Sequence, residues 1–139
     1  MRPILAVDFD GTITADNDFP NLGPLKANCK EVLQRLHEWG CIIILWTCRG
    51  GHYLTDAVEY CRKHQIPIDY VNENCPEVSF PAYPKIFANY YIDDLNIGGP
   101  LSWLEVERIV MQHPYIQEQI ERGITCTIAA NANTLTPGQ

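Results

Sequence analysis

The sequence contains no long apolar run. No apolar stretch in its 139 residues approaches the roughly 18 residues that a membrane-spanning helix needs. The N-terminus also lacks the basic, then apolar, then small-residue layout of a secretory signal peptide. These absences exclude a transmembrane span and favour one globular domain, which a chain of this length can build around a single core.

Positive charge is scarce. Ten Lys and Arg residues face 17 Asp and Glu residues, which gives a net charge of −7. Non-specific nucleic-acid binding depends on a broad basic face, and this composition argues against one. It leaves open an anionic substrate that is held through a bound cation.

The cysteines show no paired spacing. There is no C-x-x-C pair, and several of the six cysteines fall inside apolar runs. Neither a zinc site nor a disulfide framework is indicated, so we expect small buried hydrophobic residues in a reducing compartment, the cytoplasm. The cysteines are Cys29, Cys41, Cys48, Cys61, Cys75 and Cys126.

Apolar strands alternate with helix-like periodicity along the chain. Buried strands are expected at 4–7, 41–46, 68–71 and 88–92, and helices at 25–40, from 51 onward, and from Ser102 to about 112. Ser102 and Glu105 form a capping box, and Pro114 restarts or kinks the last helix. The alternation predicts an α/β sandwich with a central parallel sheet over 1–123, followed by an edge strand from Ile124 and a tail to 139.

Two acids end the first strand. The stretch Asp8-Phe9-Asp10-Gly11-Thr12 follows four apolar residues. Side chains two residues apart on a strand point the same way, and ligands of parallel sheets bind outside the carboxyl ends of the strands. Two converging carboxylates repel each other unless a proton or cation lies between them, and Mg²⁺ is a natural cation for carboxylate oxygens.

This stretch resembles the first motif, Asp-x-Asp-x-Thr, of the haloacid dehalogenase-like (HAD) superfamily. Thr47 follows the apolar run "IIILW", as in the second motif of that family. Lys85 precedes a strand as in the third motif, and Asp93 and Asp94 follow "YYI" as in the acidic fourth. The resemblance covers residues 4 to about 97 and implies a three-layer Rossmann-like sandwich.

The resemblance also implies roles for these residues. Asp8 would be the nucleophile that forms an aspartyl-phosphate, and Asp10 the general acid and then base. Thr47 and the backbone N–H groups of Phe9 and Asp10 would bind the phosphoryl oxygens. Lys85 would offset the charge that develops on the phosphoryl group.

The implied metal is Mg²⁺. Its ligands would be Asp8, the backbone carbonyl of Asp10 and an acid of the pair Asp93 and Asp94. Arg49 lies two residues after Thr47. It would either contact a substrate anion at the rim of the site or serve as a surface or helix-capping arginine.

The spacing of the motifs leaves no room for a cap domain, the insertion that closes many HAD sites. The chain is therefore similar to the capless branch, whose open sites accept bulky or macromolecular phosphoesters or use a neighbouring subunit as a lid. We predict a Mg²⁺-dependent phosphohydrolase that acts on a phosphorylated small molecule or macromolecular end, with a homo-oligomer as one arrangement. The alternatives are a non-catalytic regulatory module that binds phosphate and metal, and a phosphotransferase.

Overall fold

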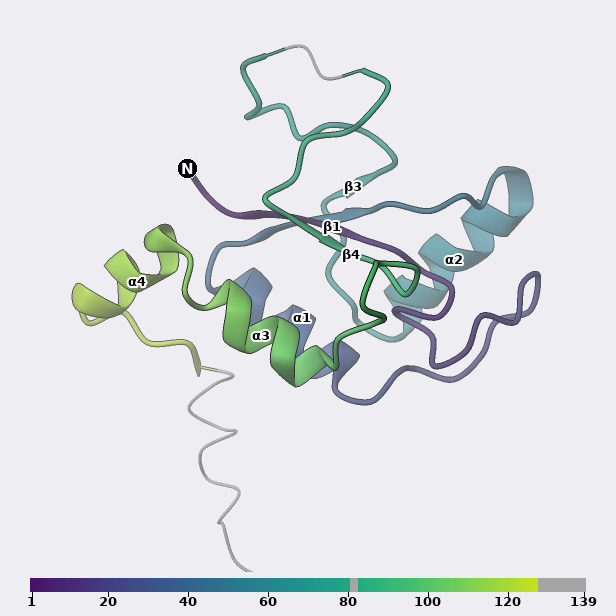
Figure 1. Cartoon of the computed structure of the whole chain (residues 1–139), viewed down its shortest axis with the longest axis horizontal. Coiled ribbons are helices and arrows are strands. Elements are labelled where there is room, and N and C mark those ends of the chain that lie inside the picture. The colour runs from purple at the N-terminus through teal and green to yellow at the C-terminus, as the bar shows by residue number, and fades with distance from the viewer. Residues whose placement is uncertain (81–82, 128–139) are drawn as a thin grey trace, which may run out of the picture.

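A computed structural model describes residues 1–80 and 83–127 (Figure 1). Strands and helices alternate over most of this length, as predicted. In chain order they are β1 (Ile4–Val7), α1 (Cys29–Glu38), β2 (Ile42–Leu45), α2 (Gly51–Lys63), β3 (Tyr70–Val71), β4 (Tyr90–Ile92), α3 (Trp103–Val110) and α4 (Pro114–Glu121). None of the helices described is long and apolar enough to cross a membrane.

The four strands form one parallel sheet in the order β3-β2-β1-β4. Val7 pairs with Leu45 on one side and with Ile92 on the other, so these three strands end at the same level. Asn89 fixes the start of the β1–β4 pairing, because its side chain accepts a 2.8 Å hydrogen bond from the Ile4 N–H and its own N–H donates to the Ile4 carbonyl at 2.8 Å. The predicted α/β fold with a parallel sheet is confirmed.

The two faces of the sheet are covered differently. One face packs against buried side chains from all four helices, and residues 72–80 and 83–89 cover the other, on the side away from α1 and α3 in Figure 1. The crossovers β1–α1–β2 and β2–α2–β3 run in the same direction, and right-handed connections therefore place both helices on one face. The return from β3 to β4 runs the opposite way and crosses the second face. Its described residues form no helix, so the predicted sandwich has an irregular layer there.

Several element boundaries differ from the prediction. The first helix begins at Cys29 instead of residue 25, because Leu25 forms an antiparallel bridge with Thr14. The Lys26 N–H likewise donates to the Ile13 carbonyl and stays outside the helix. Strands β3 and β4 are each two residues shorter at their starts than the predicted 68–71 and 88–92.

The capping prediction holds in one half. The Ser102 hydroxyl accepts a hydrogen bond from the Glu105 N–H at the start of α3. The Glu105 carboxylate, however, pairs with Arg108 on the exposed side of the helix. Pro114 starts α4, as the restart interpretation expected.

The predicted C-terminal edge strand is absent from the residues described. Residues 124–126 form no strand, and Cys126 is buried beside α1 with its thiol directed at the Arg35 carbonyl. The remainder of the predicted strand from residue 128 lies outside the described part of the chain.

Five of the six cysteines are buried, as predicted, and Cys29, Cys41, Cys48, Cys61 and Cys75 are free thiols. Burial raises the pKa of Cys41 and of Cys61 to about 12, which keeps both as unreactive thiols. Cys48 differs because it is exposed and lines the cavity described below.

Candidate functional site

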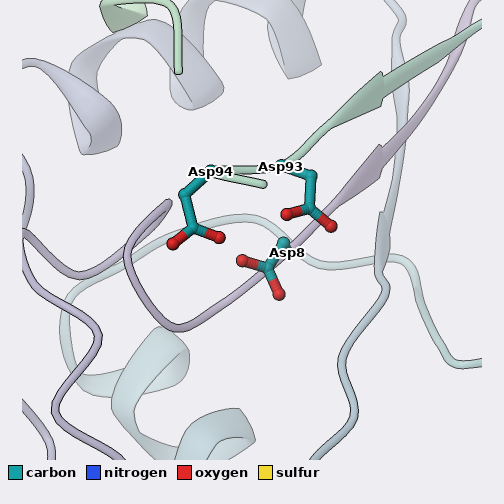
Figure 2. A group of neighbouring side chains, drawn as sticks. All are labelled: Asp8, Asp93 and Asp94. Carbon is teal, nitrogen blue, oxygen red and sulfur yellow. The ribbon is translucent and has the colours of Figure 1, made fainter. Parts of the chain in front are cut away.

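Three carboxylates meet at the carboxyl ends of two neighbouring strands, β1 and the edge strand β4. Asp8 directly follows β1, and Asp93 and Asp94 directly follow β4, which is paired with β1. Each offers an oxygen atom, and these oxygen atoms all lie within 4.8 Å of one another (Figure 2). The structure thus brings together the acids of the first and fourth motifs, in an arrangement where all three can contact one small ion.

Electrostatic repulsion within this cluster has no protein cation to relieve it. In residues 1–80 and 83–127, no lysine or arginine forms an ion pair with Asp8, Asp93 or Asp94. Burial, followed by the charges of Asp93 and Asp94, raises the pKa of Asp8 from its usual 3.8 to about 7. The Thr12 hydroxyl opposes this by donating a 2.9 Å hydrogen bond to Asp8. Burial also raises the pKa of Asp94.

The donor set fits a hard divalent cation. All three groups are carboxylates, they are half-buried, and their mutual repulsion disappears if a positive charge lies among them. Mg²⁺ binds through one or a few carboxylates and keeps several waters, so a cluster that is partly open to solvent suits it.

Gly11 allows Asp94 to approach the end of β1. Its φ of +78° lies in the left-handed region, and a Cβ added there would stand 2.4 Å from Asp94 Oδ2. A side chain at this position would therefore displace the carboxylate as well as strain the backbone. The close approach of Asp94 thus explains why position 11 is a glycine, a reason that the sequence did not reveal.

We expect Gly11→Ala to weaken divalent-metal binding. Displacement of Asp94 should lower the apparent Mg²⁺ affinity by about tenfold or more, the range seen when groups that orient metal ligands are lost. The measurement is the rise of Tm with Mg²⁺ concentration. Gly98→Ala is the matched control, because Gly98 has a φ of +93° but open space around its Cβ position. An equal loss of Mg²⁺ affinity in both variants would contradict the steric explanation.

Asp10 does not join the three-carboxylate cluster. Its two carboxylate oxygens accept hydrogen bonds from Arg49, at 2.8 Å from Nε and 2.7 Å from Nη2. The Arg49 side chain is 1% exposed and that of Asp10 is 13% exposed. The hydrogen bond with Asp10, more than any other cause, raises the pKa of Arg49. The predicted general acid is thus one half of a buried, bidentate ion pair.

Arg49 is engaged on every side by protein groups. It also donates to the carbonyls of Pro20 at 3.3 Å and Asn21 at 2.9 Å. The Phe9 and Phe19 ring centroids each lie 5.0 Å from the guanidinium carbon, which places the cation over both rings. The sequence left two roles open, a rim arginine that contacts a substrate anion and a surface or helix-capping arginine. The structure shows a buried arginine that makes four hydrogen bonds to protein groups and also lines the cavity described below.

Thr47 is positioned by Asn72, a residue that the sequence analysis missed. The Asn72 side chain accepts a 2.8 Å hydrogen bond from the Thr47 N–H and donates a 3.0 Å hydrogen bond to its carbonyl. The Thr47 hydroxyl accepts from the Arg49 N–H at 3.1 Å. The available signal was an asparagine directly after the third strand, on the sheet edge where Thr47 also lies.

A cavity of about 350 Å³ connects these groups. Its lining consists of Asp8, Asp10, Asn17, Phe19, Thr47, Cys48, Arg49, Asp93, Asp94 and Leu95. Lys85 does not line it. That side chain is exposed, with its Nζ 4.9 Å from the ring centroid of Tyr91, in a separate depression beside Phe80 and Phe87. The structure therefore unites the residues of three motifs and leaves the lysine of the third outside.

Comparison with known proteins identifies a fold relative without a stated activity. Neither a protein-family model nor a curated protein matches the chain. Among solved structures, the chain is similar to a conserved protein from Bacteroides thetaiotaomicron, with 29% sequence identity and a TM-score of 0.70. The match covers 98% of this chain and 99% of that one, so both share essentially one architecture throughout.

Proposed function

We propose that the protein is a Mg²⁺-dependent phosphohydrolase that works through an aspartyl-phosphate on Asp8. The observation that carries this proposal is the cluster of Asp8, Asp93 and Asp94 at the floor of a cavity, with no protein cation paired to it in the described residues. A capless HAD-like fold is part of the same proposal, with residues 72–80 and 83–89 in place of one helical layer.

The side chains suggest a division of labour. An Asp8 oxygen would attack phosphorus, while the Thr12 hydroxyl holds the carboxylate in place. Thr47 and the backbone N–H groups of Phe9 and Asp10 would receive the phosphoryl oxygens. Mg²⁺, when bound, would offset the charge shared by the three carboxylates and the phosphoryl group. Lys85 has no part in this scheme because it lies outside the cavity.

Proton transfer by Asp10 is the step that this structure constrains most. As general acid and base it would have to reach the leaving oxygen and later a water. Both of its oxygens are held by Arg49, so one must leave the guanidinium before it can exchange a proton with a ligand. This engagement favours the second candidate function, a non-catalytic module that binds metal and phosphate.

The deciding experiment is phosphate release from p-nitrophenyl phosphate. With Mg²⁺ we expect turnover, and with EDTA we expect none, because Asp8 then faces two other acids without a cation. Acid-quenched samples should carry a phosphoryl group on the peptide that contains Asp8. Restoring Mg²⁺ after EDTA should restore both signals.

The two candidate functions give different outcomes in this experiment. Turnover that survives exhaustive chelation would count against the metal role. A Tm that rises with Mg²⁺ and with inorganic phosphate, without any turnover, would support the binding module. Transfer of the phosphoryl group to an added alcohol instead of water would identify a phosphotransferase.

The proposal includes a cellular location and a class of substrate. The free thiols of Cys29, Cys41, Cys48, Cys61 and Cys75 suit a reducing compartment, so we place the protein in the cytoplasm. The proposed substrates are phosphorylated small molecules or phosphorylated macromolecular ends, and the next subsection chooses between them.

A further inference from the structure

Part of the cavity lining comes from a loop segment that Arg49 ties to Asp10. We call residues 17–21 the wall segment. Asn17 and Phe19 line the cavity from this segment, together with Asp8, Asp93 and Asp94. The Pro20 and Asn21 carbonyls accept hydrogen bonds from Arg49, the residue that also holds Asp10.

The Arg49 guanidinium is the centre of this arrangement. It makes four hydrogen bonds, of which two go to Asp10 beside the motif and two to the wall segment. It also lies between the Phe9 ring, from the motif, and the Phe19 ring, from the wall segment. A side chain that is 1% exposed and makes these four hydrogen bonds joins two stretches of chain as one unit.

The wall segment and the residues just after it also contact α2. The Phe19 ring meets the Tyr53 ring edge-on, with centroids 5.1 Å apart. Beyond the segment, the Tyr60 hydroxyl donates a 2.7 Å hydrogen bond to the Gly23 carbonyl. Phe19 is nevertheless 53% exposed, so the segment has a solvent side as well as a cavity side.

We propose that Arg49 is a positioning residue that latches the wall segment over the acidic cavity, and that this latch restricts the site to small phosphate esters. The restriction on substrate size rests on the proposed phosphohydrolase function, whereas the latch itself does not. In this chain a loop replaces part of the missing cap. The prediction of an open site for macromolecular phosphoesters is therefore replaced by a preference for small ones.

The cavity dimensions support the restriction. A volume of about 350 Å³ lies at the lower end of the range for small-molecule sites, which is roughly 300–1,000 Å³. A phosphoryl group with one ring or short chain fits such a space. A phosphorylated peptide exceeds this volume, so we expect it to bind only if part of the lining, such as the wall segment, moves.

The first test measures the latch without reference to activity. In Arg49→Lys the charge remains but the bidentate fork is lost, so one ammonium cannot hold Asp10 and both carbonyls. Amide hydrogen exchange in residues 15–22 should become about tenfold faster or more, while exchange in β1 and β2 stays unchanged. Arg62→Lys is the matched control, because Arg62 makes an exposed pair with Glu59 on α2. Unchanged exchange in residues 15–22 of Arg49→Lys would overturn the latch.

The second test measures substrate size. For wild type we expect kcat/KM for p-nitrophenyl phosphate to exceed that for a phosphoserine hexapeptide. In Arg49→Lys the ratio of the two should move toward the peptide by about tenfold, mainly through the peptide's KM. A purely structural loss would lower kcat for both substrates equally and leave each KM unchanged, and that result would overturn the size restriction.

A further variant tests the size restriction if the circular dichroism spectrum of Arg49→Lys shows that this variant does not fold. Phe19→Ala removes the exposed ring of the wall and leaves the Arg49–Asp10 pair in place. It should shift the ratio toward the peptide, and an unchanged ratio would overturn the size restriction.

If wild type turns over neither substrate with Mg²⁺, the phosphohydrolase proposal and the size restriction fail together. The latch is then tested by amide hydrogen exchange in residues 15–22 alone. The exchange rate should rise less in Phe19→Ala than in a folded Arg49 variant such as Arg49→Gln, because Phe19→Ala keeps the hydrogen bonds of Arg49. A larger rise in Phe19→Ala would overturn the latch.

Discussion

Asp8→Asn should abolish turnover. An amide cannot attack phosphorus as a carboxylate does, so we expect kcat for p-nitrophenyl phosphate to fall by on the order of 10⁴–10⁶-fold, as for removal of other nucleophiles. Steady-state phosphate release with Mg²⁺ is the measurement. Asp16→Asn is the matched control, because Asp16 is an exposed acid that follows the same motif. Activity near the wild-type level in Asp8→Asn would contradict the nucleophile assignment.

The same substitution should stabilise the metal-free protein at neutral pH and above. The pKa of Asp8 is raised in the folded state from 3.8 to about 7, so the folded protein binds more protons than the unfolded chain between these values. The free energy of unfolding of wild type therefore falls as pH rises from about 4 to about 7, and this loss is absent in Asp8→Asn.

In EDTA at about pH 8, the free energy of unfolding of Asp8→Asn should exceed that of wild type by on the order of 1 kcal/mol. The figure is modest because Asp8 is partly exposed, and solvent screens part of the charge repulsion. It should vanish near pH 4, where Asp8 is protonated in the folded protein. Urea unfolding at both pH values measures it. Mg²⁺ should reverse the order of stability at about pH 8, because it stabilises the cluster in wild type. A variant less stable than wild type in EDTA at that pH would contradict the repulsion argument.

Asp10→Asn should destabilise the fold strongly. The substitution leaves the Arg49 guanidinium buried beside a neutral amide that can accept at only one atom. Breaking a buried ion pair by removing one partner costs about 3–5 kcal/mol, and we expect a loss near the lower figure because the backbone carbonyls of Pro20 and Asn21 still accept from Arg49.

Urea unfolding of matched pairs tests this expectation. Glu59→Gln removes the same kind of charge from an exposed arginine pair on α2, and it should leave the free energy of unfolding unchanged. Adding Arg49→Met to Asp10→Asn should recover much of the loss, since the unpaired buried charge is then gone. A loss in Asp10→Asn no greater than in Glu59→Gln would show that the pair is loose in solution.

The central strands and the acid cluster were within reach of the sequence. Continuous apolar runs that end in polar residues identified β1 and β2. The strands follow from periodicity, which acts over short stretches of chain. The grouping of Asp8 with Asp93 and Asp94 came from the resemblance of their motifs, and the pairing of β1 with β4 gives its physical reason.

The Arg49 latch and the covering of the second face were not within reach. The engagement of Arg49 depends on the path of the loop before α1, where Leu25 bridges to Thr14 and carbonyls turn inward. No residue pattern specifies such a path. Residues 72–80 and 83–89 bury Cys75, Ile86 and Ala88 against the sheet without any periodicity that predicts a layer. Lys85 lies in this stretch, so its distance from the cavity was equally hidden.

The β1–β4 pairing has a consequence for the order in which the molecule is made. The hydrogen bond from Ile4 to Asn89 spans 85 residues, whereas β1 and β2 are joined by a single local crossover. Long-range pairings form late, because the intervening chain must first be closed into a loop. During synthesis the first carboxylate emerges long before the other two, and a chain interrupted before β4 holds only one of them. The acidic centre is therefore complete only in a chain made through β4 and Asp94, and a product truncated before that point cannot carry it.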